Sequence, residues 1–207
     1  MTNVVPLVTV NTVKLIRIRI EALLQGLSIS VRRLGTRAEG RRLQEAILAH
    51  LETGREPVVV LDLNGLEMMN SSFADEVIAT PLQRILNGEH GERYFVMDTP
   101  TRELVEDVQR PLEKRDLSLM CFQGFPDGEW WVAGVDRPVF RPLLELLMKH
   151  GSLETGAVAR LFGDTSVQNY SNRLTELGRR GLIRRAKEFG AKGGQTYTNM
   201  SLLEAAK

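Results

Sequence analysis

The chain has 207 residues, of which 43% are hydrophobic and 26% charged, so it can bury a substantial core in one large or two small domains. A single cysteine, Cys121, excludes an internal disulfide, and its apolar surroundings favour a buried thiol. No apolar run is long enough to cross a bilayer, and the pattern of a secretory signal is absent at the N-terminus. We therefore expect a cytoplasmic protein that has no contact with a membrane.

The net charge of +1 conceals opposite charges in the two parts of the chain. Residues 1–136 hold 15 Lys and Arg against 20 Asp and Glu, whereas residues 137–207 hold 12 against 6. Because a basic segment attracts polyanions, this distribution indicates that only the last third of the chain meets a nucleic acid.

The first elements follow from apolar periodicity. Alternating residues at 14–20 and again at 27–31 predict two half-buried strands. Thr36 and Glu39 have the spacing of a capping box, and the helix that they open carries an apolar stripe and ends near Gly54. The continuous apolar run at 58–61 is typical of a central strand that is covered on both faces.

The next elements continue the alternation of helix and strand. A helix is expected after the cap residues at 70–72, with Pro81 kinking or interrupting it. A strand at 94–97, a helix at 101–115 and a strand at 117–122 follow. This order predicts the α/β class, with an α/β sandwich built on a mixed, largely parallel sheet.

Residues 134–138 have the composition of a linker, which predicts one domain at 1–134 and a second, separately folding domain at 138–207. Trp130 and Trp131 lie just before it and are expected to be structural, at a strand edge or a domain contact. The three histidines lack the spacing of metal ligands, and the glycine-rich residues 190–194 lack a phosphate-binding motif. We expect no enzyme, no metal and no cofactor.

Three stretches, at residues 34–43, 60–66 and 71–76, resemble the prokaryotic STAS-like family of uncharacterised domains. That family is similar to the STAS domains of anti-sigma-factor antagonists. The resemblance covers roughly residues 27–122 and implies an α/β domain that binds a protein partner, associates with itself or senses a signal.

The same resemblance marks Ser71, with Ser72 beside it, as a phosphorylation or partner site. In the antagonists, a serine at the start of the equivalent helix is phosphorylated by a partner kinase, and the added charge breaks a protein complex. This sequence departs from the antagonist pattern at Asn70, where Asp is usual, and at Phe73, where Gly is usual. The alternative is that Ser71 or Ser72 caps the helix by accepting a hydrogen bond from its first turn.

The last third of the chain predicts three helices and a hairpin. The helices are expected at about 139–150, at 155–162 and from the cap residues 165–166 onward. The third carries an apolar stripe: Val167, Tyr170, Leu174 and Leu177. A strand after residue 181, a glycine-rich turn at 190–194 and a returning strand at 195–198 follow. A tight turn between the last two helices is the mark of a helix-turn-helix.

Residues 138–200 resemble the winged helix-turn-helix domains of prokaryotic transcription regulators. A sequence pattern that is common just before the wing of those domains is matched here by Leu174, Leu177, Gly181, Leu182 and Ile183. The resemblance implies binding to double-stranded DNA. Residues outside the apolar stripe of the third helix, together with the basic residues that follow, are the predicted DNA contacts: Gln168, Asn169, Ser171, Asn172, Arg173, Arg179, Arg180, Arg184, Arg185, Lys187 and Lys192.

The leading hypothesis is a sequence-specific DNA-binding regulator. We expect a homodimer, because two half-sites one helical turn apart multiply the specificity of a single recognition helix. One alternative is a partner-switching adaptor in which the STAS-like part is regulated and the winged helix is a protein-docking surface. Another is an accessory DNA-binding subunit of a nuclease or defence complex.

Overall fold

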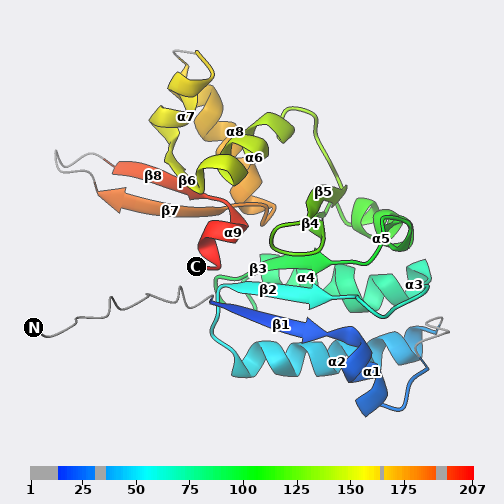
Figure 1. Cartoon of the computed structure of the whole chain (residues 1–207). Helices are drawn as coiled ribbons and strands as arrows, with labels where there is room; N and C mark the ends of the chain where they lie inside the picture. Colours follow the sequence, from blue (N-terminus) through cyan, green and yellow to red (C-terminus); the bar gives the residue numbers. More distant parts are fainter. Residues whose placement is uncertain (1–13, 31–35, 164–165, 190–194) are drawn as a thin grey trace, which may run out of the picture.

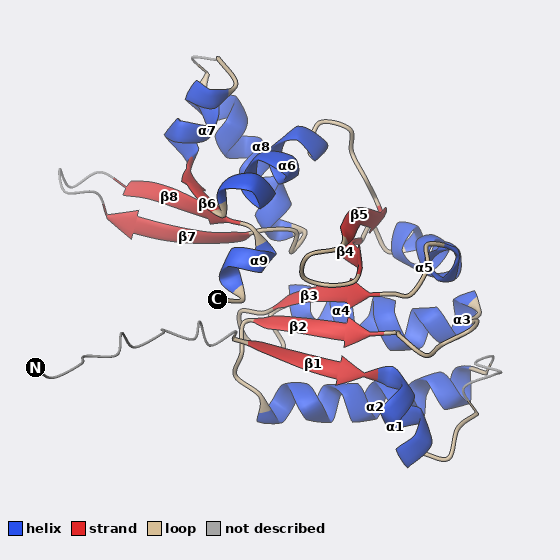
Figure 2. Ribbon diagram, viewed as in Figure 1, coloured by secondary structure: helices blue, strands red, loops and turns tan. Residues whose placement is uncertain are grey.

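The computed structural model describes residues 14–30, 36–163, 166–189 and 195–207 (Figures 1 and 2). Its first part is built around a five-stranded sheet. The elements of this part, in chain order, are β1 (Leu15–Arg19), α1 (Ile20–Gly26), α2 (Arg37–Thr53), β2 (Val58–Asp62), α3 (Ser71–Ala74), the π-helical turn η1 (Asp75–Ala79), α4 (Thr80–Leu86), β3 (Tyr94–Asp98), α5 (Glu103–Lys114), β4 (Ser118–Gln123) and β5 (Glu129–Gly134).

The five strands lie side by side in the order in which they occur in the chain. β1 to β4 are parallel, and β5 returns antiparallel to β4. The prediction of an α/β fold with a mixed, largely parallel sheet is therefore confirmed.

Two local predictions in this part are also confirmed. The side chain of Thr36 accepts a hydrogen bond from the Glu39 amide, and Glu39 Oε2 accepts one from the Thr36 amide, so the capping box is complete. Pro81 lacks the N–H that a regular α-helix requires, and the helical hydrogen bonds change to the π-helical pattern of η1 just before it.

The predicted strand at 27–31 is wrong within the described residues, because residues 20–26 form α1 and the chain then turns. The amides of Leu27 and Ile29 donate to carbonyls of α1, so they are not available to a strand ladder. Ser28 has a φ of 56°, in the left-handed region, which ends the helix. Ile29 is buried in the core, so the alternation reflects a packed turn. Val31 lies outside the described residues.

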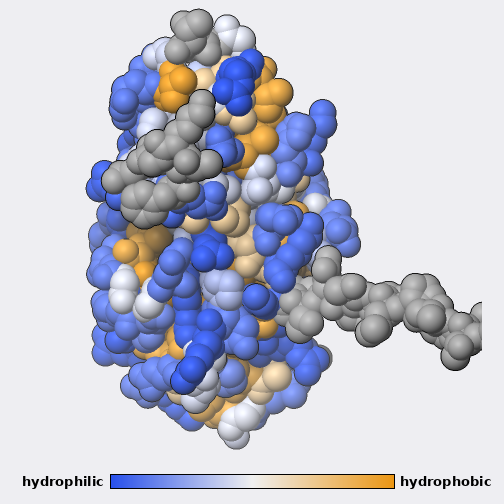
Figure 3. Space-filling model, turned by 90° about the vertical axis from the view of Figure 1, so that its left-hand side faces the viewer, coloured by the Kyte–Doolittle hydropathy of each residue, from blue (hydrophilic) through white to orange (hydrophobic). Residues whose placement is uncertain are grey.

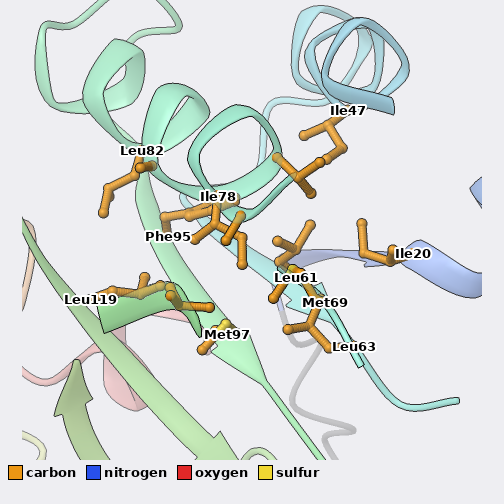
Figure 4. Close-up of a cluster of buried hydrophobic side chains, with 14 of the residues drawn as sticks. Ile20, Ile47, Leu61, Leu63, Met69, Ile78, Leu82, Phe95, Met97 and Leu119 are labelled. Carbon is orange, nitrogen blue, oxygen red and sulfur yellow. The ribbon is translucent and has the colours of Figure 1, made fainter. Parts of the chain in front are cut away.

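Alternate side chains of the strands point to opposite faces of the sheet, and each face has its own hydrophobic core. Figure 4 shows part of the first core, which packs against α1, α2, η1, α4 and α5. The strands contribute to it Ile18, Val59, Leu61, Phe95, Met97, Leu119 and Cys121. To the second core they contribute Val58, Val60, Tyr94, Val96, Met120, Phe122 and Val132.

The second core is closed by the C-terminal unit, residues 138–207. This unit contains α6 (Arg141–His150), β6 (Ser152–Glu154), α7 (Thr155–Leu161), α8 (Val167–Arg179), β7 (Arg184–Phe189), β8 (Gln195–Met200) and α9 (Leu202–Ala205). Its strands form an antiparallel sheet in the order β6-β8-β7. The three longer helices lie where the sequence predicts helices.

One continuous cluster of buried side chains joins the sheet to this unit, so Val58 and Val60 are fully buried although no helix of the first part covers them. Polar contacts add to this packing. Arg141 lies over the ring of Trp130, 4.6 Å from its centroid, in agreement with the structural role expected for that residue. The boundary near residues 134–138 falls between β5 and α6, and separate folding of the two parts stays a prediction.

The shared core implies that the two parts stabilise each other. Leu143 lies on α6 and is 1% exposed. We expect Leu143→Ala to lower the free energy of unfolding by about 2 to 4 kcal/mol, because it leaves a cavity in the second core. Trp131 packs against the first core, so its fluorescence in a Trp130→Phe background reports on the first part and should nevertheless detect this shift. Lys149→Ala, on an exposed site of the same helix, is the control. An unchanged tryptophan transition in Leu143→Ala would contradict the coupling.

Candidate nucleic-acid interface

Helix α8 presents one apolar face to the core and one polar face outward. Tyr170, Leu174 and Leu177 are buried as predicted. The predicted stripe is wrong at Val167, which is 46% exposed because the first residue of the helix projects beyond the core. Gln168 and Asn169 are exposed in the first turn. No acidic residue occurs in α8 before Glu176, so apart from Val167 the outer side of its first two turns is polar or basic.

Aromatic stacking fixes the start of α8 against the end of α7. The rings of Phe162 and Tyr170 are stacked with centroids 5.3 Å apart, and the Arg173 guanidinium lies 5.6 Å from the Tyr170 centroid. Leu161 and Phe162 are exposed as well, and hydrophobic surface shows near the top of the molecule, where α7 and α8 meet (Figure 3). The orientation of α8 at this end therefore depends on side-chain packing.

Two of the predicted contacts form a hydrogen-bonded pair on the outer face of α8. Gln168 Nε2 donates to Asn172 Oδ1 at 3.0 Å, across one turn of the helix. Both side chains are exposed, so the pair lies at the surface and its remaining donor and acceptor capacity faces outward.

Two of the predicted DNA contacts, Arg185 and Ser171, join β7 to α8. The Arg185 guanidinium lies 3.9 Å from the Tyr197 ring centroid and donates to the hydroxyls of Ser171 and Thr175. Burial lowers the pKa of Arg185. These contacts hold the hairpin to the helix, and a contact of either side chain with phosphates or bases stays a prediction.

Arg180, another predicted DNA contact, has a side chain that is 7% exposed and turned toward the first part of the chain. It donates to the carboxylate and carbonyl of Asp116, to Ser118 Oγ and to Glu176 Oε1. Asp116 lies between α5 and β4. Arg180 therefore fixes the C-terminal end of α8 to the sheet and is not available to DNA.

The other predicted basic residues are distributed over the surface. Arg184 pairs with Glu92 at 3.3 Å and so also contacts the first part of the chain. Arg179 is exposed but lies at the C-terminal end of α8, roughly 18 Å along the helix from its first turn at about 1.5 Å per residue. Lys187 is exposed on β7, and Lys192 lies outside the described residues.

At the other predicted site, the cap of α3 is Asn70, the first of the three expected cap residues 70–72. Its side chain accepts a hydrogen bond from the Phe73 amide at 2.9 Å. Ser71 donates from its hydroxyl to Asp107 Oδ1 of α5 at 3.3 Å. Asn70 therefore fills the capping role proposed for Ser71 or Ser72, because its side-chain oxygen accepts the hydrogen bond from the first turn of the helix.

The sequence reasoning missed a cluster at the carboxyl ends of β2 and β3. Arg17 Nη1 donates to Asp62 at 3.1 Å and to Asp98 at 2.9 Å. The second Asp98 oxygen accepts hydrogen bonds from the amides of Gly124 and Phe125. Burial by itself lowers the pKa of Arg17, but the two carboxylates outweigh it and raise the pKa. Because its hydrogen bonds are formed internally, this cluster fastens the 124–128 turn across the sheet.

A cleft of about 650 Å³ lies beside this cluster, between the edge of the sheet and the C-terminal unit. Its walls include apolar side chains from both parts, among them Leu15, Phe125, Met148 and Leu203. A molecule in this cleft would contact both parts of the chain at once.

The described residues contain no group of His, Cys, Asp and Glu side chains that could hold a metal ion. Burial raises the pKa of the Cys121 thiol, which keeps it protonated and unreactive at neutral pH. Within the described ranges, none of the helices has the length and apolar character that a membrane crossing needs.

The contacts of Arg180 predict a stability effect with a matched control. Arg180→Ala should lower the free energy of unfolding by about 2 kcal/mol, because several charge-assisted hydrogen bonds are lost together. Arg179→Ala removes the neighbouring, 78% exposed guanidinium and should change the free energy of unfolding by less than about 0.5 kcal/mol. Urea unfolding of both variants makes the comparison, and equal effects would show that Arg180 is not the anchor.

The Ser71 contact predicts a coupling with Asp107. A carboxylate introduced by Ser71→Asp would face the carboxylate of Asp107, so Asp107→Asn should stabilise that variant by about 0.5 kcal/mol more than it changes the wild type. Thermal unfolding of the two single variants and the double variant gives the coupling energy. A coupling of zero would mean that the two side chains do not interact.

Comparison with known proteins gives one match, in the first part of the chain. Residues 39–89 match the family model described as a STAS-like domain of unknown function (DUF4325). No curated protein and no solved structure matches the chain. The matched segment covers most of α2 and runs through β2, α3, η1 and α4. This segment is therefore similar to a STAS-like domain, in agreement with the resemblance drawn from the sequence.

Proposed function

We propose that residues 138–207 form a winged helix-turn-helix domain that binds double-stranded DNA and that the chain is a transcription regulator. The order α6, β6, α7, α8, β7, β8 supports this assignment, since two successive helices are followed by an antiparallel pair of strands. In this arrangement α8 is the recognition helix and the β7–β8 hairpin is the wing.

The outer face of α8 is the observation that carries the proposal. Over its first two turns it exposes Gln168, Asn169, Asn172 and Arg173, with no acidic residue among them. Carboxamides and guanidinium groups are the side chains that most often contact base edges in the major groove. A solvated face with no ligand would be expected to mix acidic residues with the basic ones.

Phosphate contacts would come from the basic residues around this face. Candidates are Arg160 on α7, Lys187 on β7 and Lys192, which lies between β7 and β8 in the sequence. Arg180, Arg184 and Arg185 hold the C-terminal unit together and to the sheet, so we leave them out of the interface. The excess of 12 basic over 6 acidic residues in 137–207 supports attraction to a polyanion.

The STAS-like part is proposed as the regulatory part. Self-association through it would give a homodimer with two recognition helices, which is the usual basis of specificity in helix-turn-helix regulators. Because it shares a core with the C-terminal unit, a partner or a small molecule that binds the first part would also bias the position of α8. We assign no catalytic step, metal or cofactor to the protein.

Fluorescence anisotropy with the full chain tests the proposal. Binding to labelled duplexes should weaken steeply as salt rises. Lys192→Ala should weaken binding to all sequences alike and lower the salt-dependence slope by about one, because a phosphate contact reads no base. Arg173→Ala should instead reduce the preference for a selected duplex over a random one, by about 1 to 3 kcal/mol.

The control is Arg55→Ala, which removes an exposed cation from the first part of the chain and should leave binding unchanged. If the protein binds no duplex even at low salt, the C-terminal unit is not a DNA-binding domain and the proposed function is wrong.

A further inference from the structure

We propose that Asn172 reads an adenine in the major groove and that Gln168 is the residue that positions its carboxamide. This inference rests on the proposed function and adds to it the base that the site recognises. It depends on the hydrogen-bonded pair that these two side chains form on the outer face of α8.

The chemistry of the side chain selects the base. Adenine presents the N7 acceptor and the N6 amino donor in the major groove, and a carboxamide matches both at once. Guanine presents two acceptors there, N7 and O6, which suit a guanidinium or an ammonium group. Asn172 offers Nδ2–H to N7 and Oδ1 to the N6 amino group, so adenine is the base that satisfies both of its polar atoms.

The geometry leaves this capacity intact. Gln168 Nε2 occupies one lone pair of Asn172 Oδ1, at 3.0 Å. A carbonyl oxygen has two lone pairs, so the second can still accept from the adenine amino group. Nδ2 of Asn172 keeps both of its hydrogens for other acceptors, since the bond to Gln168 uses only the oxygen.

The contact with Gln168 also restrains the side chain before DNA arrives. A surface asparagine rotates freely, and fixing it on binding costs entropy. Because Gln168 lies one turn earlier on the same face, its hydrogen bond favours one orientation of the Asn172 carboxamide in advance. The stacked rings of Phe162 and Tyr170 hold the start of the helix itself against α7.

The test uses the full-length protein and a duplex selected by it from a random library. Each adenine of the selected duplex is replaced in turn by 7-deazaadenine, which removes the N7 acceptor and keeps the pairing with thymine. At one adenine in each half-site the replacement should weaken binding by about 5-fold or more, the range expected for a bidentate base contact. In Asn172→Ala the same replacement should have no effect.

Two further variants complete the design. Gln168→Ala should reduce the effect of the replacement without abolishing it, because the carboxamide is still present but no longer restrained. Gln25→Ala, which removes an exposed carboxamide from α1, should leave the effect unchanged.

The outcomes separate adenine readout by Asn172 from DNA binding as such. If the protein binds duplex DNA but no adenine is sensitive to the replacement, or if the sensitivity survives in Asn172→Ala, adenine readout is overturned while DNA binding stands. If no duplex is bound, the proposed function fails and this inference fails with it.

Discussion

One face of the five-stranded sheet, the face that carries Val58 and Val60, is not covered by the helices of the first part. The need to bury this face is the constraint on which the rest of the structure depends. Successive parallel strands are added in one direction, and crossover connections are right-handed, so the connecting helices all lie on one face. The opposite face carries fully buried side chains such as Val58 and Val60 and would be exposed without a further layer. The C-terminal unit is that layer, which makes its position a consequence of the hydrophobic effect.

This constraint also orients α8. Its C-terminal end is fixed to the sheet through Arg180 and Asp116, while its first turn, with Gln168 and Asn169, points away from the shared core. One end of the helix is therefore sensitive to changes in the first part of the chain, and the other is free to meet a ligand. In the proposed function, a partner that binds the first part of the chain would affect the outer face of α8 through packed side chains and the Arg180–Asp116 ion pair.

Features that depend on neighbouring residues could be predicted from the sequence. The capping box of Thr36 and Glu39 and the buried strand at 58–61 are determined within a few residues, and the structure has them where expected. The strand at 27–31 failed because alternation alone does not distinguish a strand from a packed turn. The STAS-like resemblance was carried by local motifs and is supported by the family match to residues 39–89.

Features that depend on distant residues could not be predicted. Helical periodicity correctly placed most of the outer face of α8. It did not reveal that Arg180 donates a hydrogen bond to Asp116, 64 residues earlier, or that Arg184 donates one to Glu92. The cluster of Arg17, Asp62 and Asp98 joins three strands and has no motif of its own. The partners of such side chains are brought together only by the fold. For this reason several basic residues that were predicted to bind DNA form contacts within the protein instead.

The central claim is that one end of α8 is anchored and the other meets DNA, and an NMR titration of the labelled full-length protein with a short duplex tests it most directly. The account predicts that amide shifts concentrate in residues 166–173 and in the β7–β8 hairpin, while Arg180 and its neighbours on β4 stay unchanged. Shifts confined to the last turn of α8 or to the first part of the chain would contradict it.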